Sequence, residues 1–471
     1  MTSSDTAPKS VLRQAQDDTL RAGAELEIEF TDVLANGQGV GRASGIVVFC
    51  FGPLPGERAR VRIETVKQRY AVAEMLELLV ESPKRARPFC PVFGACGGCQ
   101  LQHLAYDAQL TWKRDVVRNA LSRIGGFADV EVSETIGMNE PRAYRNKMSV
   151  VVDHRSEPPA LGFYRQRSHE VVPIDACPIV TPQLDAVLAA LAENRVNATV
   201  APMLRGARHL VARAARATGQ VVLTVTTDEA IAEAKRNARA VRRELPAVAG
   251  IGNSYGPASE NAVLGRHYQL LDGDGEIEES VGGVRYRISA ASFFQINVQI
   301  LERIFDFIEP WLKTPGSIVD LYCGSGTFAL YFARRGWSVT GIEENRNAIA
   351  EAEANARLNG LGGRARFEAG RVEQMAAVPR VAGILQEADV VFLDPPRKGC
   401  DNVVLSAIAQ ARVRNVWYLS CDAATLARDL KFLASKGYRL GVVQPFDMFP
   451  QTGHVETLVQ LEHFKIDTRH D

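Results

Sequence analysis

The pattern of apolar and polar positions divides the 471-residue chain into a short polar start and three longer regions. Residues 1–22 are polar and of mixed charge, which predicts a flexible tail. After them, ELEIEF and ARVRIETV alternate strictly between polar and apolar positions, and IVVFCF is a short apolar run. Glycines between the first strands permit tight turns. Short strands at this spacing predict a small β-barrel of the oligonucleotide-binding type over residues 23–82.

The middle region mixes helical and strand patterns. A cysteine-rich segment is followed by a helical stretch around 106–124 and a charged helix over 229–243. Between these helices, KMSVVVD, PALGFYR, HLVARAA and QVVLTVTT have the apolar, β-branched composition of strands. We therefore expect a central α+β domain over residues 83–290.

From about Ser317 onward, short apolar strands alternate with helices rich in alanine and arginine. The strands are SIVDLY, SVTGIE, RARFEA, DVVFLD and NVWYLS. This alternation predicts a doubly wound, Rossmann-like α/β domain over residues 291–471, with a mostly parallel sheet. Ligands of such sheets bind at the carboxyl ends of the strands, so the residues after each strand are the candidates for a site.

The first two of these strands end in residues that suit a nucleoside-containing cofactor. Asp320-Leu-Tyr-Cys-Gly-Ser-Gly-Thr327 places two glycines before a helix, and the next strand ends at Glu343, where a carboxylate can accept hydrogen bonds from ribose hydroxyls. The spacing differs from the dinucleotide pattern, which favours S-adenosylmethionine over NAD. The fourth strand ends in Asp394-Pro-Pro, which presents Asp394 at the same edge. The alternatives are a purely structural glycine turn and a capping aspartate.

The fifth strand ends at Cys421, directly before a predicted helix. A thiol at a helix start is expected to be exposed and to have a lowered pKa, which makes it a candidate nucleophile. A thiolate that adds to C6 of a uracil makes C5 reactive toward a methyl donor, and a base must then remove the C5 proton. Glu456 is the first candidate for that base and His454 the second. A buried, inert cysteine is the alternative.

Four further cysteines are spaced as metal ligands rather than as disulfides. Four thiolates suit zinc or an iron–sulfur cluster, and spacing alone does not choose between them. Cysteines that merely pack remain the alternative. The four are Cys90, Cys96, Cys99 and Cys177.

Composition adds little beyond this picture. Lys+Arg and Asp+Glu both number 55, so the net charge does not indicate a nucleic-acid partner. Basic residues nevertheless cluster locally at 58–69, 84–87 and 142–147. Neither a leader-like apolar segment nor a membrane span is evident, and nothing indicates an obligate protein partner. We expect a cytoplasmic protein.

In combination, these motifs resemble one family over nearly the whole chain, the RNA uracil-C5 methyltransferases with an N-terminal TRAM domain and an iron–sulfur cluster. The motifs are C-x5-C-G-G-C-x-x-Q, Y-R-N-K-M, S-F-F-Q-x-N, D-L-Y-C-G-S-G, D-P-P-R-K-G and S-C. Two departures stand out: Ala423 replaces the usual proline after the nucleophilic cysteine, and Ala369-Gly-Arg371 offers no counterpart for an adenine contact.

The resemblance implies Cys421 as nucleophile and Glu456 as base. It implies that Gln295, Tyr322, Glu343 and Asp394 contact S-adenosylmethionine, that Phe293 and Phe294 line the site, and that the four cysteines hold a 4Fe–4S cluster. A TRAM barrel combined with four cysteines is more similar to the enzymes acting on 23S ribosomal RNA than to those acting on transfer RNA, which remain the alternative substrates. The target uridine must be flipped out of its stack.

Two rival functions remain at this point. One is an enzyme that methylates an amino group of adenine or cytosine, because D-P-P-R loosely resembles the loop used there; such an enzyme needs no thiol. The other is an RNA-binding iron–sulfur protein that has kept an inactive methyltransferase fold.

Overall fold

The computed structural model describes residues 20–157, 159–193, 199, 202–231, 235–257, 263–376 and 378–464. The described residues form two compact units, one within residues 20–87 and 103–105 and the other within residues 88–102 and 106–464. Residues 1–19 of the predicted tail lie outside the described residues, as do residues 232–234 of the predicted charged helix.

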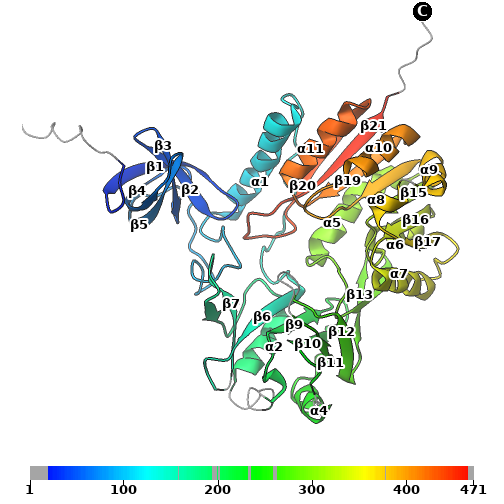
Figure 1. Cartoon of the computed structure of the whole chain (residues 1–471), viewed down its shortest axis with the longest axis horizontal. Helices are drawn as coiled ribbons and strands as arrows, with labels where there is room; N and C mark the ends of the chain where they lie inside the picture. The colour runs from blue at the N-terminus through cyan, green and yellow to red at the C-terminus, as the bar shows by residue number, and fades with distance from the viewer. Residues whose placement is uncertain are drawn as a thin grey trace, which may run out of the picture. The chain divides into compact units, whose positions relative to one another are not determined.

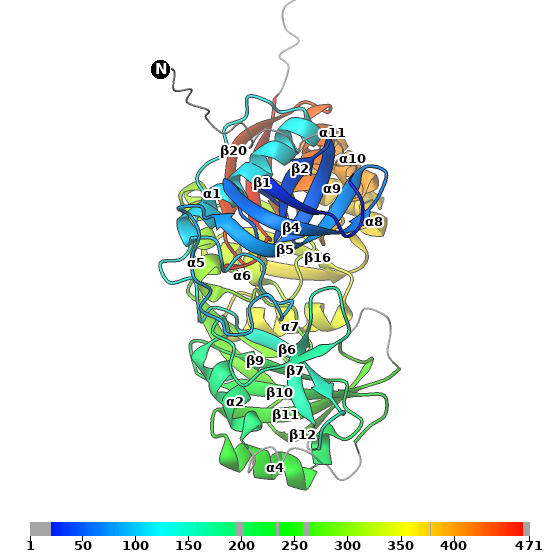
Figure 2. The same ribbon diagram turned by 90° about the vertical axis from the view of Figure 1, so that its left-hand side faces the viewer.

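The first unit contains the predicted barrel (Figure 2). Five strands close in the order β1-β2-β3-β5-β4, with β4 returning to pair with β1. From Arg58 onward along β4, apolar side chains enter the barrel and charged ones face outward, as the alternation predicted, whereas Glu57 at the start of the strand is buried. Ile28, Phe30, Val48 and Val61 fill the interior. The strands are β1 (Glu25–Val33), β2 (Gln38–Ala43), β3 (Ile46–Phe51), β4 (Glu57–Val66) and β5 (Tyr70–Val80).

In the second unit, the first sheet has seven strands in the order β12-β11-β10-β9-β6-β7-β8, most of which lie side by side in Figure 2. Helices α2 (Pro182–Ala192) and α4 (Lys235–Glu244) bury apolar side chains against one face of it. The strands are β6 (Lys147–Asp153), β7 (Ala160–Tyr164), β8 (Val171–Pro173), β9 (His209–Ala214), β10 (Val221–Thr227), β11 (Val248–Tyr255) and β12 (His267–Gly273). The middle region is therefore α+β, as predicted.

The second sheet of this unit has the order β17-β16-β15-β18-β19-β21-β20. Its first five strands are parallel, and β21 and β20 add an antiparallel edge. All five predicted strands are present, so the doubly wound prediction is confirmed. The strands are β15 (Ser317–Leu321), β16 (Ser338–Glu343), β17 (Ala365–Ala369), β18 (Val390–Leu393), β19 (Asn415–Ser420), β20 (Tyr438–Phe446) and β21 (Glu456–His463).

Helices cover both faces of this sheet (Figure 1). Successive strand residues point to opposite faces, so Ile318 and Val319 belong to different apolar cores. One core contains α5 (Val298–Ile308), α6 (Thr327–Arg334) and α7 (Arg346–Leu358). The other contains residues of α1 (Tyr106–Ala120), the π-helix Leu121–Gly125, α8 (Val372–Met375), α9 (Pro379–Gln386), α10 (Asn402–Ala411) and α11 (Ala423–Ala434). The 3₁₀ helix Glu309–Leu312 follows α5.

A hairpin of β13 (Glu276–Val281) and β14 (Val284–Ser289) packs into the core formed by α5 and α6. Tyr286 of the hairpin donates a hydrogen bond to the Thr327 carbonyl at 2.8 Å. The boundary predicted at residue 290 stays a prediction. No helix in the described part of the chain is long and apolar enough to cross a bilayer.

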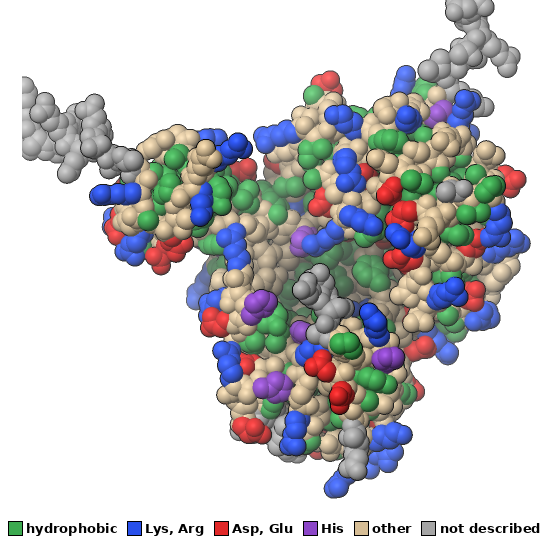
Figure 3. Space-filling view, viewed as in Figure 1, with side chains coloured by type: hydrophobic (Ala, Val, Ile, Leu, Met, Phe, Trp, Pro, Cys, Tyr) green, Lys and Arg blue, Asp and Glu red, His purple; other side chains and the backbone are tan. Residues whose placement is uncertain are grey.

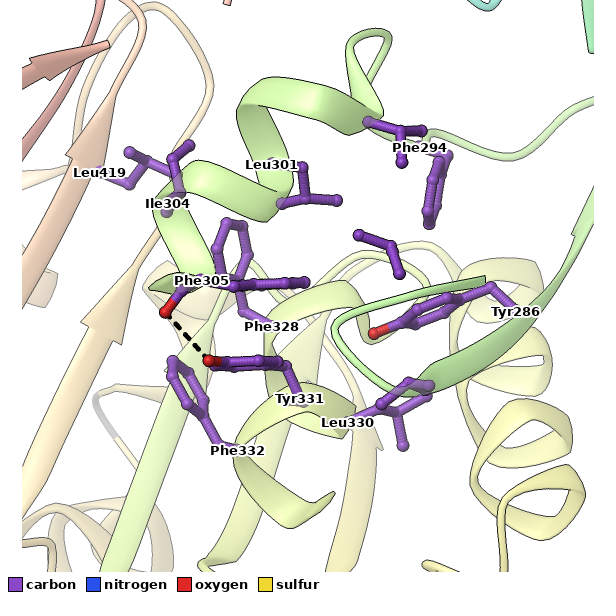
Figure 4. Packing of buried hydrophobic residues seen from close by; sticks show 14 of the residues in the cluster. Tyr286, Phe294, Leu301, Ile304, Phe305, Phe328, Leu330, Tyr331, Phe332 and Leu419 are labelled. Atoms are coloured by element: carbon purple, nitrogen blue, oxygen red, sulfur yellow. Dashed lines mark hydrogen bonds between the residues drawn. The ribbon is translucent and has the colours of Figure 1, made fainter. Parts of the chain in front are cut away.

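The same core contains a stack of aromatic rings (Figure 4). The rings of Phe305 and Tyr331 lie 3.8 Å apart and nearly parallel, and the Tyr331 hydroxyl donates to the Phe305 carbonyl at 2.9 Å. Phe328 meets Phe305 edge to face. This stack joins α5 to α6, and α6 begins at the glycine turn after β15.

We expect Phe305→Ala to lower the free energy of unfolding by about 3–5 kcal/mol, because it removes a buried ring and leaves a cavity. Urea denaturation followed by tryptophan fluorescence would measure the loss. Val403→Ala is the matched control, since Val403 is 46% exposed on α10, and it should change the midpoint little. A Phe305→Ala midpoint equal to the control's would contradict this packing account.

Candidate active site

One large cavity, of about 990 Å³, lies at the carboxyl ends of the parallel strands. Its walls include the ends of β15, β16, β18 and β19, the segment before α5 and the loop before β21. The residues expected to react or to hold the cofactor all line it. These are Gln295, Tyr322, Glu343, Asp394, Cys421 and Glu456.

The glycine turn after β15 positions the first half of this cavity. Gly324 and Gly326 have φ of 53° and 84°, a left-handed backbone that favours glycine. Gly324 donates its N–H to one oxygen of Glu343 at 3.2 Å, and the Asn345 N–H donates to the other at 2.8 Å. The Glu343 carboxylate is thereby fixed at the end of β16, with lone pairs left to accept hydroxyl donors.

Asp320, the last buried polar residue of β15, was not singled out from the sequence. It is 1% exposed, and neither carboxylate oxygen has a hydrogen-bond partner among the described residues. Burial raises its pKa well above the usual range, and Asp394 and Glu343 add to the shift. An unpartnered buried carboxylate facing this cavity can accept a hydrogen bond from a cationic or amino group of a ligand. Its place at the head of the glycine motif was the available signal.

Asp394 lies at the end of β18, between the cofactor side and the thiol. The Gln295 side-chain N–H₂ donates to its Oδ2 at 3.4 Å. Burial raises the pKa of Asp394 to about 7, although the side chain keeps some exposure toward the cavity. Asp394 therefore changes charge near neutral pH.

Cys421 follows β19 and lines the cavity, but its pKa differs from the expectation. We expected the helix start to lower it; instead burial, Glu456 and Asp394 raise it to about 12, against a smaller opposing effect of Arg397. Burial is the largest cause, because it disfavours the charged thiolate. The N-terminus of α11 is already capped by Asp422, whose Oδ1 accepts from Ala424 N at 3.0 Å and Thr425 N at 2.8 Å. The thiol is protonated in the unliganded protein.

Glu456 lies beside Cys421 because β19 and β21 are antiparallel. Their register pairs Ser420 with Thr457, so the next residues on each side are Cys421 and Glu456. Glu456 is 4% exposed. Burial and Asp394 raise its pKa well above the usual range, against the effect of Arg397. The carboxyl groups of Glu456 and Asp394 together bind a proton more readily than either group would alone.

His454, the second candidate base, contacts Arg397 at 3.2 Å and is not among the residues that line the cavity. Burial and then Arg397 lower its pKa to about 4, so it is neutral at pH 7. The geometry favours Glu456 over His454 as the candidate base.

Of the two phenylalanines expected to line the site, only Phe293 does so; it is 69% exposed at the cavity. The expectation for Phe294 is wrong. Phe294 is 1% exposed and packs in the apolar core beside Tyr286 (Figure 4). Exposed and buried positions alternate from Ala291 to Phe294, so the two neighbouring rings lie on opposite sides of the segment.

Past the third strand, Arg371, Val372 and Glu373 line the cavity. The sequence comparison offered no side chain for this position. Arg371 lies 3.9 Å from Glu373, so the pair is partly neutralised and forms a polar wall beside the glycine turn.

The four cysteines predicted as metal ligands come together from distant positions. Burial and the neighbouring thiols raise the pKa of Cys99 to about 12 and of Cys177 to about 11. Cys90 N donates to Gln102 Oε1 at 3.1 Å, and Cys177 N donates to Asp185 Oδ1 at 2.7 Å. Even so, the described residues contain no group of three or more ligating side chains arranged to hold a metal ion. The residue types fit a cluster, but the side-chain arrangement does not demonstrate one.

Fold and cavity define a methyltransferase of the S-adenosylmethionine-dependent type with an N-terminal five-stranded barrel. A family profile described as tRNA (Uracil-5-)-methyltransferase matches residues 105–464, and a TRAM domain profile matches residues 20–76. The chain therefore belongs to the RNA uracil-5 methyltransferase family. This membership does not support the amino-methylating and the inactive alternatives.

Similar proteins agree with this family. An uncharacterized RNA methyltransferase of Halalkalibacterium halodurans is 37% identical over 93% of this chain and 96% of its own length. One of Caldanaerobacter subterraneus is 36% identical over 94% and 99%. The crystal structure of the tRNA (uracil-54, C5)-methyltransferase of Pyrococcus abyssi, in complex with S-adenosyl-L-homocysteine, superimposes with a TM-score of 0.71 at 26% identity, covering 93% of this chain and all of that one.

The raised pKa of Asp394 makes a prediction about stability. A carboxyl whose folded pKa exceeds its unfolded value binds its proton more tightly when folded, so it destabilises the fold as pH rises from about 4 to about 7. Asp394→Asn should therefore weaken this pH dependence. Urea midpoints at pH 5 and pH 7.5 would measure it. Asp306→Asn, on the exposed side of α5, should keep the wild-type slope, and an Asp394→Asn slope equal to it would refute the assignment.

Proposed function

We propose that this enzyme transfers a methyl group from S-adenosylmethionine to C5 of a uridine in RNA, with Cys421 as nucleophile and Glu456 as base. The observation that carries the proposal is the placement of both residues, side by side, in the cavity that also contains Gln295, Glu343 and Asp394. Each of the two reacting residues has a separate chemical task, and neither task needs a metal.

The cofactor half of the cavity suits S-adenosylmethionine. Glu343 is held to accept hydrogen bonds from the ribose hydroxyls, and Asp320 and Asp394 present carboxylates toward a cationic ligand. Binding of a cation also lowers the raised pKa values of these two carboxyl groups. When bound, the cofactor supplies an electrophilic methyl group on a sulfonium.

Cys421 adds its sulfur to C6 of the uracil, which turns C5 into an enolate-like carbon able to take the methyl group. Glu456 then removes the proton from C5, and the Cys421–C6 bond breaks to restore the aromatic ring. On addition the thiol proton passes to solvent, and on elimination the sulfur regains a proton from solvent. The net reaction therefore releases the one proton that Glu456 takes from C5.

The raised thiol pKa fits a nucleophile that is activated only after substrate has bound. Ionised Glu456 or Asp394 opposes a second negative charge at Cys421. Cofactor and substrate change the charge and solvation of this group of residues, so addition is coupled to a filled site. A resting thiol is also protected from oxidation, which requires the thiolate.

RNA is the substrate class, and two specific targets have support. The TRAM barrel combined with four clustered cysteines favours 23S ribosomal RNA. The similarity to the Pyrococcus abyssi enzyme, which is named for uridine 54 of transfer RNA, favours transfer RNA as the second candidate. Either way, the reacting uridine must leave its stack to reach Cys421.

We further propose that Cys90, Cys96, Cys99 and Cys177 hold a 4Fe–4S cluster with a structural task. All four are free thiols, and Cys177 joins the three others from about 80 residues away. The reaction described above transfers no electron, so the cluster would serve the fold or RNA binding.

The central experiment offers 5-fluorouridine-containing ribosomal and transfer RNA, together with S-adenosylmethionine, to the protein. Fluorine at C5 cannot leave as a proton, so the wild type should form an adduct that survives denaturing electrophoresis. Cys421→Ala should form none and should lose turnover by at least about 100-fold. Glu456→Gln should still form the adduct while turnover on ordinary uridine falls by about 100-fold or more.

Cys400→Ala is the matched control, because Cys400 is a buried cysteine that does not line the cavity. It should keep wild-type adduct formation and turnover. Absence of a wild-type adduct on every RNA would sink the covalent mechanism, and the RNA that does form an adduct identifies the substrate class.

The cluster proposal has its own test. Cys99→Ala and Cys177→Ala should lose iron and the broad visible absorption of an iron–sulfur chromophore when purified without oxygen. Cys50→Ala, in the barrel, should keep both. Wild-type protein that contains zinc, or no metal at all, would refute the assignment.

A further inference from the structure

The loop from Asp447 to Val455, which leads into Glu456, is bound to segments more than 300 residues earlier in the chain. Gln451 lies at its centre, 3% exposed and with φ of 70°. Its carbonyl accepts the backbone N–H groups of Gln100 and Leu101, each at 3.0 Å. These two donors directly follow Cys99, so the cysteine-rich segment holds the loop at its midpoint.

The Gln451 side chain and backbone also pair with Gln109 of α1. Gln109 Nε2 donates to Gln451 Oε1 at 3.0 Å, and Gln451 N donates to Gln109 Oε1 at 3.2 Å. The remaining side-chain N–H₂ of Gln451 donates to the Pro141 carbonyl at 3.3 Å. Two buried amides that satisfy each other in this way fix both position and orientation.

The residues before Gln451 are fixed in the same manner. Lys113 of α1 forms a fully buried ion pair with Asp447 and donates to the Phe449 carbonyl at 3.1 Å. The Tyr144 hydroxyl donates to the Pro450 carbonyl at 2.9 Å. Consequently, side chains of α1 and Tyr144 hold the loop backbone from Asp447 to Gln451 in place.

The hydrogen bonds that hold this loop affect the position of residues in the active-site cavity. Phe449 lines the cavity, and Glu456 is the first residue of β21, where sheet pairing begins. β19 and β20 pair with β21 on its two sides, with Phe446 of β20 opposite Glu456, and only four residues separate Glu456 from Gln451 along the chain. The side-chain direction of Glu456 therefore depends on this strand pairing and on the loop that delivers the chain to it.

We propose that Gln451, clamped by Gln109, is a positioning residue that aims Glu456 at the proton it removes. The inference rests on the proposed function, because it assigns proton removal to Glu456. Through Gln451, the cysteine-rich segment and α1 affect proton removal by Glu456 and not cofactor binding. Neither Gln451 nor Gln109 lines the cavity, so both act through the loop.

The test is Gln451→Gly, which removes the side-chain bonds of Gln451 to Gln109 and Pro141 and suits a φ of 70°. We expect kcat on uridine-containing RNA to fall by about tenfold and KM to fall with it, because proton removal slows after the adduct has formed. An adduct should then accumulate on ordinary uridine RNA, as it does not in the wild type. Cofactor affinity by calorimetry and the rate of 5-fluorouridine adduct formation should stay at wild-type values, because neither needs the base.

Gln109→Ala removes the same clamp from α1 and should reproduce this split, and the double variant should be no worse than either single one. Gln444→Leu is the matched control: Gln444 is 5% exposed on β20, and its amide donates to the Glu134 carbonyl at 2.7 Å, outside the loop. It should keep wild-type kcat.

Two outcomes would overturn the inference alone, provided that the wild type forms its 5-fluorouridine adduct. One is a wild-type kcat in Gln451→Gly. The other is a parallel loss of cofactor affinity, adduct formation and kcat, which would mean general unfolding of the site. A wild type that forms no adduct would instead overturn the proposed function, and this inference with it.

Discussion

The site depends on the desolvation of three ionisable groups at one edge of a parallel sheet. Asp394, Cys421 and Glu456 follow or begin strands whose ends meet at a single cavity, and burial is the largest cause of the raised pKa of each. The unliganded protein thus disfavours negative charge where a cationic donor and a thiolate are needed. Ligand binding changes how strongly the site disfavours negative charge. The reactivity of Cys421 therefore depends on the charge of its surroundings, because its thiol is not already ionised.

The fold supplies this arrangement through topology. Parallel strands β15, β16, β18 and β19 deliver their carboxyl ends to the same place, and antiparallel β21 returns from the opposite direction to set Glu456 beside Cys421. Helices on both faces bury the sheet. The cysteine-rich segment and α1 then hold the loop before β21 through Gln451 and Lys113. Residues far apart in the sequence become one chemical unit.

Several sequence-based expectations were specific enough to be tested by the structure. The five strands of the C-terminal sheet and the N-terminal barrel are present, because their periodicity and flanking glycines are local properties. Every residue expected to react or bind the cofactor lines the cavity. Their individual roles remain proposals. The expectations for Phe294 and for the thiol pKa were wrong, since the side to which a ring points and the burial of Cys421 are decided only when neighbouring atoms are placed.

By itself, the sequence determined the order of the domains and the identity of the residues at each strand end. These follow from short-range patterning and from motifs a few residues long. Only the tertiary structure decided which polar groups are buried without partners, such as Asp320, and which loop is braced, as at Gln451. The physical reason is that burial and hydrogen bonding between segments more than 300 residues apart depend on three-dimensional packing, which no local pattern encodes.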